Sequence, residues 1–382
     1  TLNYAIDAVA DGGTVCITDS CTIDKENAWK AHGKTVTIRG MQENAASVLC
    51  GAAELPRLCI NDGAYFTNMT LKLLSTSANS VHAEGNPVTI AADVVVEGVK
   101  EIYGGSRFSE VQSTDLKLYA GTYEKIFGGS YEKTVLGDTH VTVGGSVNLG
   151  IADTTKWSNH EHVYMLYGAG DTGSVAGDTY VTVEEGASFI YVYGGGRSAG
   201  SEVSGSTNVV FSGNAMSVYG GSYQGTTAAA SVKILGGTVQ QVFGGCEDAS
   251  MTGDVNISVL GGEVSRRIYG GCYNDFNGSW KTSYSVTGCI GVEIGGNANL
   301  SLSTDSDRGI NAVSRYGSAI AGECGILIFN DGTYDTYKNK IGSNFFTNGQ
   351  KYHYLVNATA GGNGSVQSGK LKVVPNEEYT AT

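Results

Sequence analysis

The segment MSVYGGSYQGTTAAASVKILGGTVQQVFGGC, residues 216–246, contains one complete unit of a repeat that runs through the middle of the chain. An aliphatic residue, an aromatic residue and paired glycines stand near its start, and the same phrase closes it. Copies recur about 25 residues apart, with one longer step of 40 residues. Such a period indicates one structural unit stacked on itself. The phrases begin at Ile102, Ile126, Leu166, Val192, Val218, Val242 and Ile268.

Each unit contains short strand-like runs and no helical period. The run SVKILGG from Ser231 alternates in polarity and ends at paired glycines, as do THVTVGG from Thr139 and VNISVLGG from Val255. We therefore predict an all-β fold, a parallel β-helix (solenoid) in which every turn pairs with the next.

The N-terminal residues predict a cap for the first turn. Apolar residues recur at helical spacing from Leu2 to Val9 and are followed by Asp-Gly-Gly, which predicts a short amphipathic helix. Strand-like runs follow, starting at Thr14, Lys34, Arg57, Asn68 and Val88. We divide the chain into an N-terminal cap with the first turns (1–97), a repeat β-helix with inserted loops (98–335) and a C-terminal cap (336–382).

The run NYAIDAVADGGTVCI from Asn3, followed by FTNMTLKL from Phe66, resembles the pectate-lyase-like parallel β-helix superfamily. The phrases VYGGG and GGTV also resemble repeats of Gly-rich, adhesin-like surface proteins of Gram-positive anaerobic bacteria. The resemblance implies a right-handed coil, a hand that the period alone does not fix. Its motifs are architectural and bring no catalytic residues with them.

Composition narrows the classes of partner. The net charge of −13, without any Lys/Arg run, argues against nucleic acid. No apolar run is long enough to span a bilayer, so we expect no membrane insertion. The chain starts at Thr1 without a leader, which leads us to expect part of a larger multidomain surface protein, secreted or displayed at the cell surface.

None of the eight cysteines forms a CxxC pair, which favours buried thiols over a zinc site. Cys246 and Cys272 occupy the same position in successive units. Stacked strands about 4.8 Å apart would bring them within disulfide range, but parallel Cβ directions suit a ladder of free thiols equally. Both arrangements stay open.

In each repeat phrase, strand alternation sends one of the two adjacent apolar residues inward and the other outward. Burying tyrosine hydroxyls without partners would cost about 1–3 kcal/mol each, so we predict that the aliphatic column points inward and the aromatic column forms an exposed ladder. Such a ladder could stack sugar rings; the alternative is that the rings stack only on one another. The predicted ligand-binding aromatics are Tyr103, Phe127, Tyr167, Tyr193, Tyr219, Phe243 and Tyr269.

Two insertions supply the other predicted ligand-binding residues, because insertions in repeat proteins form loops on one face. The long step contains Trp157, His160 and His162; this HxH could bind a metal, but no third ligand is evident and we favour a solvated loop. The insertion after Cys272 contributes Tyr273 and Trp280.

Asp138, Asp178 and Asp254 each follow a glycine at the entry of equivalent strands. Paired carboxylates can bind Ca²⁺ or act as acid and base on a glycan. Aspartate in this position also bonds local backbone N–H groups, and we favour that role. We therefore predict no catalytic and no metal-binding residues, with Ca²⁺ as the one cofactor to consider.

Together these features lead us to expect an adhesin-like binding module of an extracellular bacterial surface protein. Its expected partners are host or dietary glycans or glycoproteins, with mucins and immunoglobulins among them. The alternative is a secreted polysaccharide lyase or glycoside hydrolase that acts on acidic polysaccharide. An acidic protein attracts such a substrate poorly, so we prefer the binding module and leave the question of enzymatic activity open.

Overall fold

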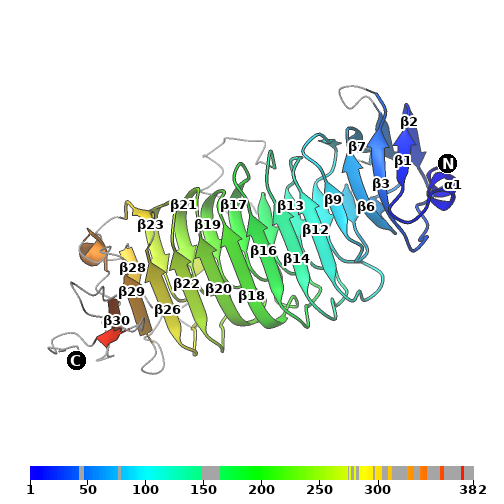
Figure 1. Cartoon of the computed structure of the whole chain (residues 1–382). Coiled ribbons are helices and arrows are strands. Elements are labelled where there is room, and N and C mark those ends of the chain that lie inside the picture. Colours follow the sequence, from blue (N-terminus) through cyan, green and yellow to red (C-terminus); the bar gives the residue numbers. More distant parts are fainter. Residues whose placement is uncertain are drawn as a thin grey trace, which may run out of the picture.

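The computed structural model describes residues 1–42, 47–75, 79–147, 164–273, 275–276, 279–280, 284–295, 297–302, 309–311, 325–329, 336–341, 353–356 and 371–373. The chain winds into an elongated parallel β-solenoid, with turns stacked from the N-terminal to the C-terminal end (Figure 1). This confirms the predicted fold class.

Three parallel sheets form the sides of the solenoid within the described ranges. Sheet A has 14 strands: β1 (Thr14–Ile17), β3 (Thr35–Gly40), β6 (Gly63–Thr67), β9 (Val88–Ile90), β12 (Thr114–Leu118), β14 (Thr139–Val143), β16 (Thr179–Val183), β18 (Val203–Phe211), β20 (Thr227–Ile234), β22 (Val255–Val259), β26 (Ile290–Ile294), β29 (Gly325–Phe329), β30 (His353–Val356) and β31 (Leu371–Val373), of which β31 alone is antiparallel to its neighbour. Sheet B has 4 strands: β2 (Ser20–Ile23), β4 (Val48–Gly51), β7 (Thr70–Leu73) and β10 (Val95–Glu97).

Sheet C carries the repeat phrases. In the described part of the chain it has 11 strands, ten in one continuous order and β28 beside β23: β5 (Arg57–Cys59), β8 (Ser80–His82), β11 (Glu101–Tyr103), β13 (Lys125–Phe127), β15 (Met165–Tyr167), β17 (Ser188–Tyr193), β19 (Asn214–Tyr219), β21 (Thr238–Phe243), β23 (Glu263–Tyr269), β27 (Asn299–Leu300) and, paired with β23, β28 (Gly309–Asn311). A small hairpin of β24 (Asp275–Phe276) and β25 (Ser279–Trp280) projects beside it, and the 3₁₀ helix η3 (Lys338–Lys340) lies near the C-terminal end.

Register between turns is regular. Thr139 of β14 pairs with Thr179 of β16, and Val141 with Val181, so equivalent residues form columns along the axis. The aliphatic residues of the repeat phrases, such as Ile126 and Val192, are buried in the central core, as predicted. At the N-terminal end α1 (Leu2–Ala8) buries Leu2 and Ile6 against the first turn and forms the expected cap.

The prediction of an exposed aromatic ladder is wrong. All seven aromatics of the repeat phrases are buried on the outer side of sheet C, where they form a second apolar core. Successive rings stack with centroids 4.6–5.7 Å apart, and the imidazole of His82 extends the stack beyond Tyr103 at 4.6 Å. The alternative interpretation, that the rings stack on one another to stabilise successive turns, is confirmed. The buried residues are Tyr103, Phe127, Tyr167, Tyr193, Tyr219, Phe243 and Tyr269.

Hydroxyl partners explain the error. The Tyr103 hydroxyl donates to Glu101 Oε2 at 2.9 Å, and that of Tyr167 donates to the sulfur of Met165 at 2.8 Å, each two residues back on the same strand. Tyr193 reaches the carboxylate of Glu247, which comes from a loop. Because burial leaves these hydroxyls with acceptors, the assumed cost of burying them is largely avoided.

Loops that fold back over sheet C cover the stack. The residue four positions after each stacked aromatic forms a column that we call the cover column: Arg107, Tyr131, Asp171, Arg197, Tyr223, Glu247 and Tyr273. Tyr131 lies edge-on to Tyr103 at 5.7 Å, and Tyr273 lies edge-on to Phe243 at 5.0 Å. The same loops have a small core of their own that includes Val111, Val135 and Val175, and we call this layer of loops the lobe.

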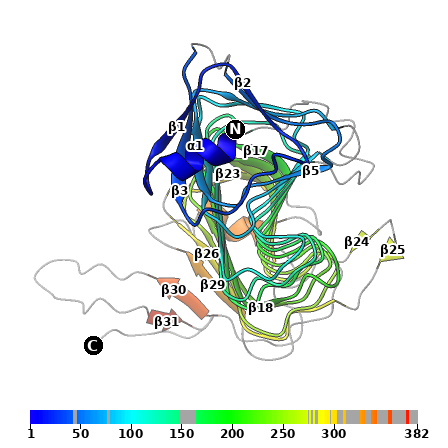
Figure 2. The same ribbon diagram turned by 90° about the vertical axis from the view of Figure 1, so that its right-hand side faces the viewer.

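The lobe begins only at the turn of β11. After β5 and β8 the chain reaches sheet A directly, at Gly63 and Val88, whereas after β11 it makes the longer connection 104–113. Figure 2, viewed from the N-terminal end, shows the first turns in blue with a roughly triangular outline and the stacked loops of the later turns projecting beneath β5. The outer side of sheet C therefore has a step at this point, where the uncovered first turns meet the turns that the lobe covers.

The cysteine alternatives are resolved for the residues described. The seven described cysteines form no disulfide, and Cys246 and Cys272 are both fully buried. Burial raises the pKa of the Cys246 thiol to about 11, which keeps it protonated at neutral pH.

Candidate functional site

The predicted ligand-binding residues that the structure describes are buried or half-buried. The seven stacked aromatics are enclosed, and Tyr273 is half-buried against Tyr219 and Phe243. Trp157, His160 and His162 lie outside the described residues, and so does the side chain of Trp280 in β25. The stack therefore offers no open platform for a sugar ring.

The three strand-entry aspartates hold the turns together. Asp138 Oδ1 accepts the backbone N–H of Asp178 at 2.8 Å, Asp178 Oδ1 accepts that of Ser206 at 2.7 Å, and Asp254 Oδ1 accepts that of Cys289 at 2.8 Å. The sequence favoured bonds to local backbone N–H groups, and this part of the prediction is wrong. The role of the three carboxylates is structural, but each bonds the backbone of the next turn. Within the described ranges, no three His, Cys, Asp or Glu side chains gather as a candidate metal site.

The step on the outer side of sheet C creates two neighbouring hollows that share Arg57. Sheet C starts at β5 because residues 24–34 of the preceding turn form no strand. That irregular segment carries Trp29 and cannot pair with β5, so a space opens between them. On the other side, the first loop of the lobe provides a wall that ends at Phe108.

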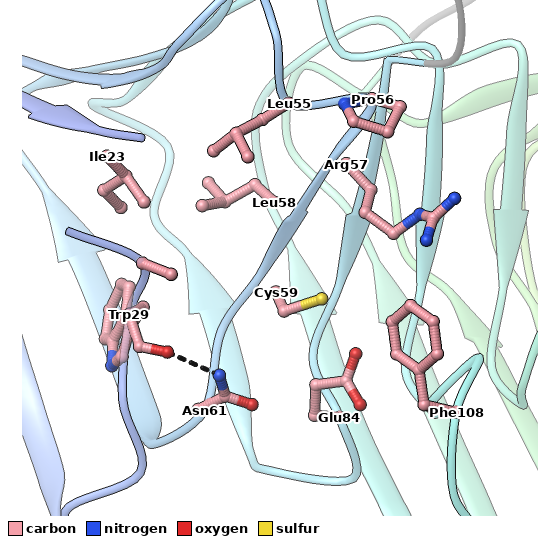
Figure 3. A pocket seen from close by; sticks show the side chains of 11 residues that line it. Ile23, Trp29, Leu55, Pro56, Arg57, Leu58, Cys59, Asn61, Glu84 and Phe108 are labelled. Carbon is pink, nitrogen blue, oxygen red and sulfur yellow. Dashed lines mark hydrogen bonds between the residues drawn. The ribbon is translucent and has the colours of Figure 1, made fainter. Parts of the chain in front are cut away.

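The first hollow is an apolar pocket of about 410 Å³ between Trp29 and the first loop of the lobe (Figure 3). Ile23, Leu55 and Leu58 line one part of it. Arg57 and Phe108 lie together on the side opposite Trp29, with the guanidinium 5.3 Å from the centre of the ring. Phe108 is 62% exposed.

Trp29 is fixed as a wall of this apolar pocket. Its Nε1–H donates to Asp62 Oδ2 at 2.9 Å, and its carbonyl accepts a hydrogen bond from Asn61 Nδ2 at 2.6 Å. Asp62 is itself buried and also accepts from His32 and from the backbone N–H of Lys34. The pocket wall is thus held by a hydrogen-bond network.

The second hollow is polar and has a volume of about 300 Å³. It lies where the cover column starts, beside Arg107 and Tyr131, whose guanidinium and ring are 4.2 Å apart. Lys100 forms an ion pair with Glu124 at 3.1 Å along its wall. Glu101 accepts from both Tyr103 and Lys125, so its carboxylate is held in one position.

Two neutral groups lie between the charged side chains. Burial, with Arg57 and Arg107 nearby, lowers the pKa of His82 to about 3, so the ring is uncharged at neutral pH. Burial and the Glu84 carboxylate raise the pKa of the Cys59 thiol to about 12. Cys59 and His82 are adjacent in register on β5 and β8, and neither contributes charge to the hollows.

No family model, curated protein or solved structure matches this chain. The resemblance seen in the sequence is therefore supported at the level of the fold, a parallel β-solenoid. Among the residues that the structure describes, no helix has the length and apolar character needed to cross a bilayer.

Sequence reasoning missed the hollows altogether. Arg57, Arg107 and Phe108 belong to no motif, and their neighbours come from separate turns. One signal was present in the sequence. The connection from a sheet C strand to the next sheet A strand becomes longer after Tyr103, and a longer loop covers surface that the preceding turns leave open.

Proposed function

We propose that the chain is an adhesin-like binding module of an extracellular bacterial surface protein, and that it binds host or dietary glycans or glycoproteins in the polar hollow. The observation that supports this most directly is the lining of the hollow. Lys100 and Arg107 donate hydrogen bonds, Glu101 and Glu124 accept them, and Tyr131 contributes an aromatic surface. Sugar hydroxyls act both as donors and as acceptors, so a lining of both kinds suits them.

The arrangement of Arg107 favours recognition of a ligand. Its guanidinium lies over the ring of Tyr131 and donates to Glu132 at 3.1 Å, so its orientation is set before any ligand arrives. A guanidinium held in this way presents its remaining N–H groups at low entropic cost. The hollow is also built on stacked strands, which keep the binding groups fixed.

The lyase or hydrolase alternative has less support. The carboxylates of Asp138 and Asp178, its candidate acid and base, are each engaged with a backbone N–H of the next turn. An acid–base pair must reach the scissile bond, whereas these groups serve the stacking of turns. The surface location and the bacterial origin rest on the resemblance of the Gly-rich phrases.

A glycan and glycoprotein array that includes mucins and immunoglobulins tests the proposal. We expect a defined set of ligands, and about tenfold weaker binding by Arg107→Gln, equivalent to about 1.4 kcal/mol. Lys233→Gln, an exposed lysine on the outer side of sheet A, is the control and should bind as the unmodified chain does.

Two results would overturn this function. The first is an array without reproducible ligands, or equal losses in the Arg107 and Lys233 variants. The second is calcium-dependent turnover of an acidic polysaccharide that disappears in Asp138→Ala, which would favour the enzyme instead.

A further inference from the structure

The apolar pocket has a different chemistry from the polar hollow, and this chemistry does not suit a sugar. Its walls are mostly hydrocarbon, from Ile23, Leu55, Pro56 and Leu58, with the indole of Trp29 at one end. The neutral thiol of Cys59 behaves as a further weakly polar wall. A cavity of about 410 Å³ with such a lining is typical of sites that take an apolar group and orient it with a few polar contacts.

Arg57 supplies one polar contact. Arg107 and Arg197 form ion pairs with Glu132 and Asp171, but Arg57 makes no ion pair with any carboxylate that the structure describes. Its guanidinium instead lies beside the exposed Phe108 ring. A guanidinium that borders an apolar pocket and has donors to spare is a natural partner for a ligand carboxylate.

Glu84 supplies the other contact. Its carboxylate borders the Cys59 thiol, which hydrogen-bonds to it, and its buried Oε1 has no other hydrogen-bond partner among the described residues. The residue has a φ of 55°, a left-handed conformation that is costly for a side chain other than glycine or asparagine. The backbone therefore holds a carboxylate in the pocket wall that keeps acceptor capacity beyond its bond with Cys59, and a ligand N–H would use it.

We propose that this pocket binds an N-acylated apolar α-amino acid, which is the chemistry of a peptide C-terminus. The ligand carboxylate pairs with Arg57, its amide N–H donates to Glu84, and its side chain packs against Leu55 and Leu58. In such a ligand the carboxylate, the amide N–H and the side chain are only a few bonds apart. Their proposed partners, Arg57, Glu84 and the apolar wall, line one pocket (Figure 3). This inference does not depend on glycan binding in the polar hollow.

The test is titration of the intact chain with N-acetyl-leucine and with N-acetyl-leucinamide, followed by NMR or calorimetry. We expect the acid to bind and the amide to bind at least about tenfold more weakly, because the amide carries no charge for Arg57. Arg57→Gln should remove this preference. Arg39→Gln, an exposed arginine of β3, is the matched control and should leave it unchanged.

A second variant separates loss of the site from loss of folding. Ala28 is exposed at the rim of the apolar pocket, so Ala28→Trp should block ligand entry and leave the circular dichroism spectrum unchanged. Equal binding of acid and amide, unchanged binding by a folded Ala28→Trp, or no binding at millimolar ligand would each overturn the proposal. A longer acylated peptide ending in leucine that binds more tightly than N-acetyl-leucine would identify a peptide as the source, and equal binding would identify the acyl amino acid.

Discussion

Removing the Asp62 carboxylate should destabilise the N-terminal turns. Asp62 is 1% exposed and accepts hydrogen bonds from Trp29 Nε1 at 2.9 Å, from His32 N and Nδ1 at 2.7 Å each, and from Lys34 N at 3.3 Å. Asp62→Ala leaves these buried donors without their acceptor. It also releases the indole that forms one wall of the apolar pocket.

The expected cost follows from the number and kind of these bonds. A hydrogen bond to a charged group contributes about 1.5–3 kcal/mol, and removing one partner of a buried charged pair typically costs about 3–5 kcal/mol. Because the bonds share one acceptor, their contributions do not add. We therefore expect the free energy of unfolding to fall by about 3–5 kcal/mol in Asp62→Ala.

Urea unfolding followed by circular dichroism measures this loss, and hydrogen exchange shows whether the first turns open before the rest. The control is Asp93→Ala, an exposed aspartate that accepts from Thr67, with an expected change within about 0.5 kcal/mol. A loss below about 1 kcal/mol in Asp62→Ala would refute the reasoning, because a buried carboxylate with several donors cannot be dispensable.

The pH dependence gives an independent check. Burial alone would raise the pKa of Asp62, but the hydrogen bonds from His32, Trp29 and the backbone lower it overall. Its stabilisation should therefore be complete above the unfolded pKa of about 3.9 and decline as the pH falls through the lower folded value. Asp62→Ala should flatten this part of the curve.

Two further predictions concern the stacked turns. A Cβ at Gly194 would overlap the carbonyl of Gly220 in the next turn, so Gly194→Ala should lower the unfolding free energy by about 1–3 kcal/mol. Gly236→Ala is the control and should change it little, because the nearest atom to a Cβ at Gly236 is 3.5 Å away. Equal effects of the two substitutions in urea unfolding would contradict this. The pKa of His82 is about 3, below the usual value of 6.5. The contribution of His82 to the free energy of unfolding should therefore be complete above pH 6.5 and be lost as the pH drops toward 3. An NMR titration in which the ring protonates above about pH 5 would refute the assignment.

The sequence was informative where one residue type recurs at one register. The period of the repeat phrase identified the solenoid, and the buried positions of Ile126 and Val192 follow from the need of a narrow core for apolar side chains. The capping helix was predictable from the spacing of Leu2 and Ile6. A structural role for Asp138 was predictable from the glycine before it, but its bond to Asp178 of the next turn was not.

The aromatic ladder was misplaced because the groups that satisfy and cover it were not foreseen: Glu101 and Met165 each accept from the tyrosine two residues further along the same strand, and other partners come from other turns. Alternation along one strand cannot reveal that Glu247, from another turn, bonds the Tyr193 hydroxyl, or that Tyr131 covers Tyr103. A signal did exist four residues after each aromatic, where tyrosine, arginine and acidic residues alternate. The two hollows escaped prediction because they depend on a missing strand and a lengthened loop in neighbouring turns.

The step beneath β5 also bears on how such a scaffold can diversify. Each turn contacts mainly its neighbours, so the position of the recess is set by where the connection after a sheet C strand first grows long, here at residues 104–113. Trimming that single connection would remove Arg107 and Phe108, make Tyr131 the first residue of the cover column, and relocate the recess by one turn. New specificities could thus arise through small deletions and insertions that leave every strand untouched.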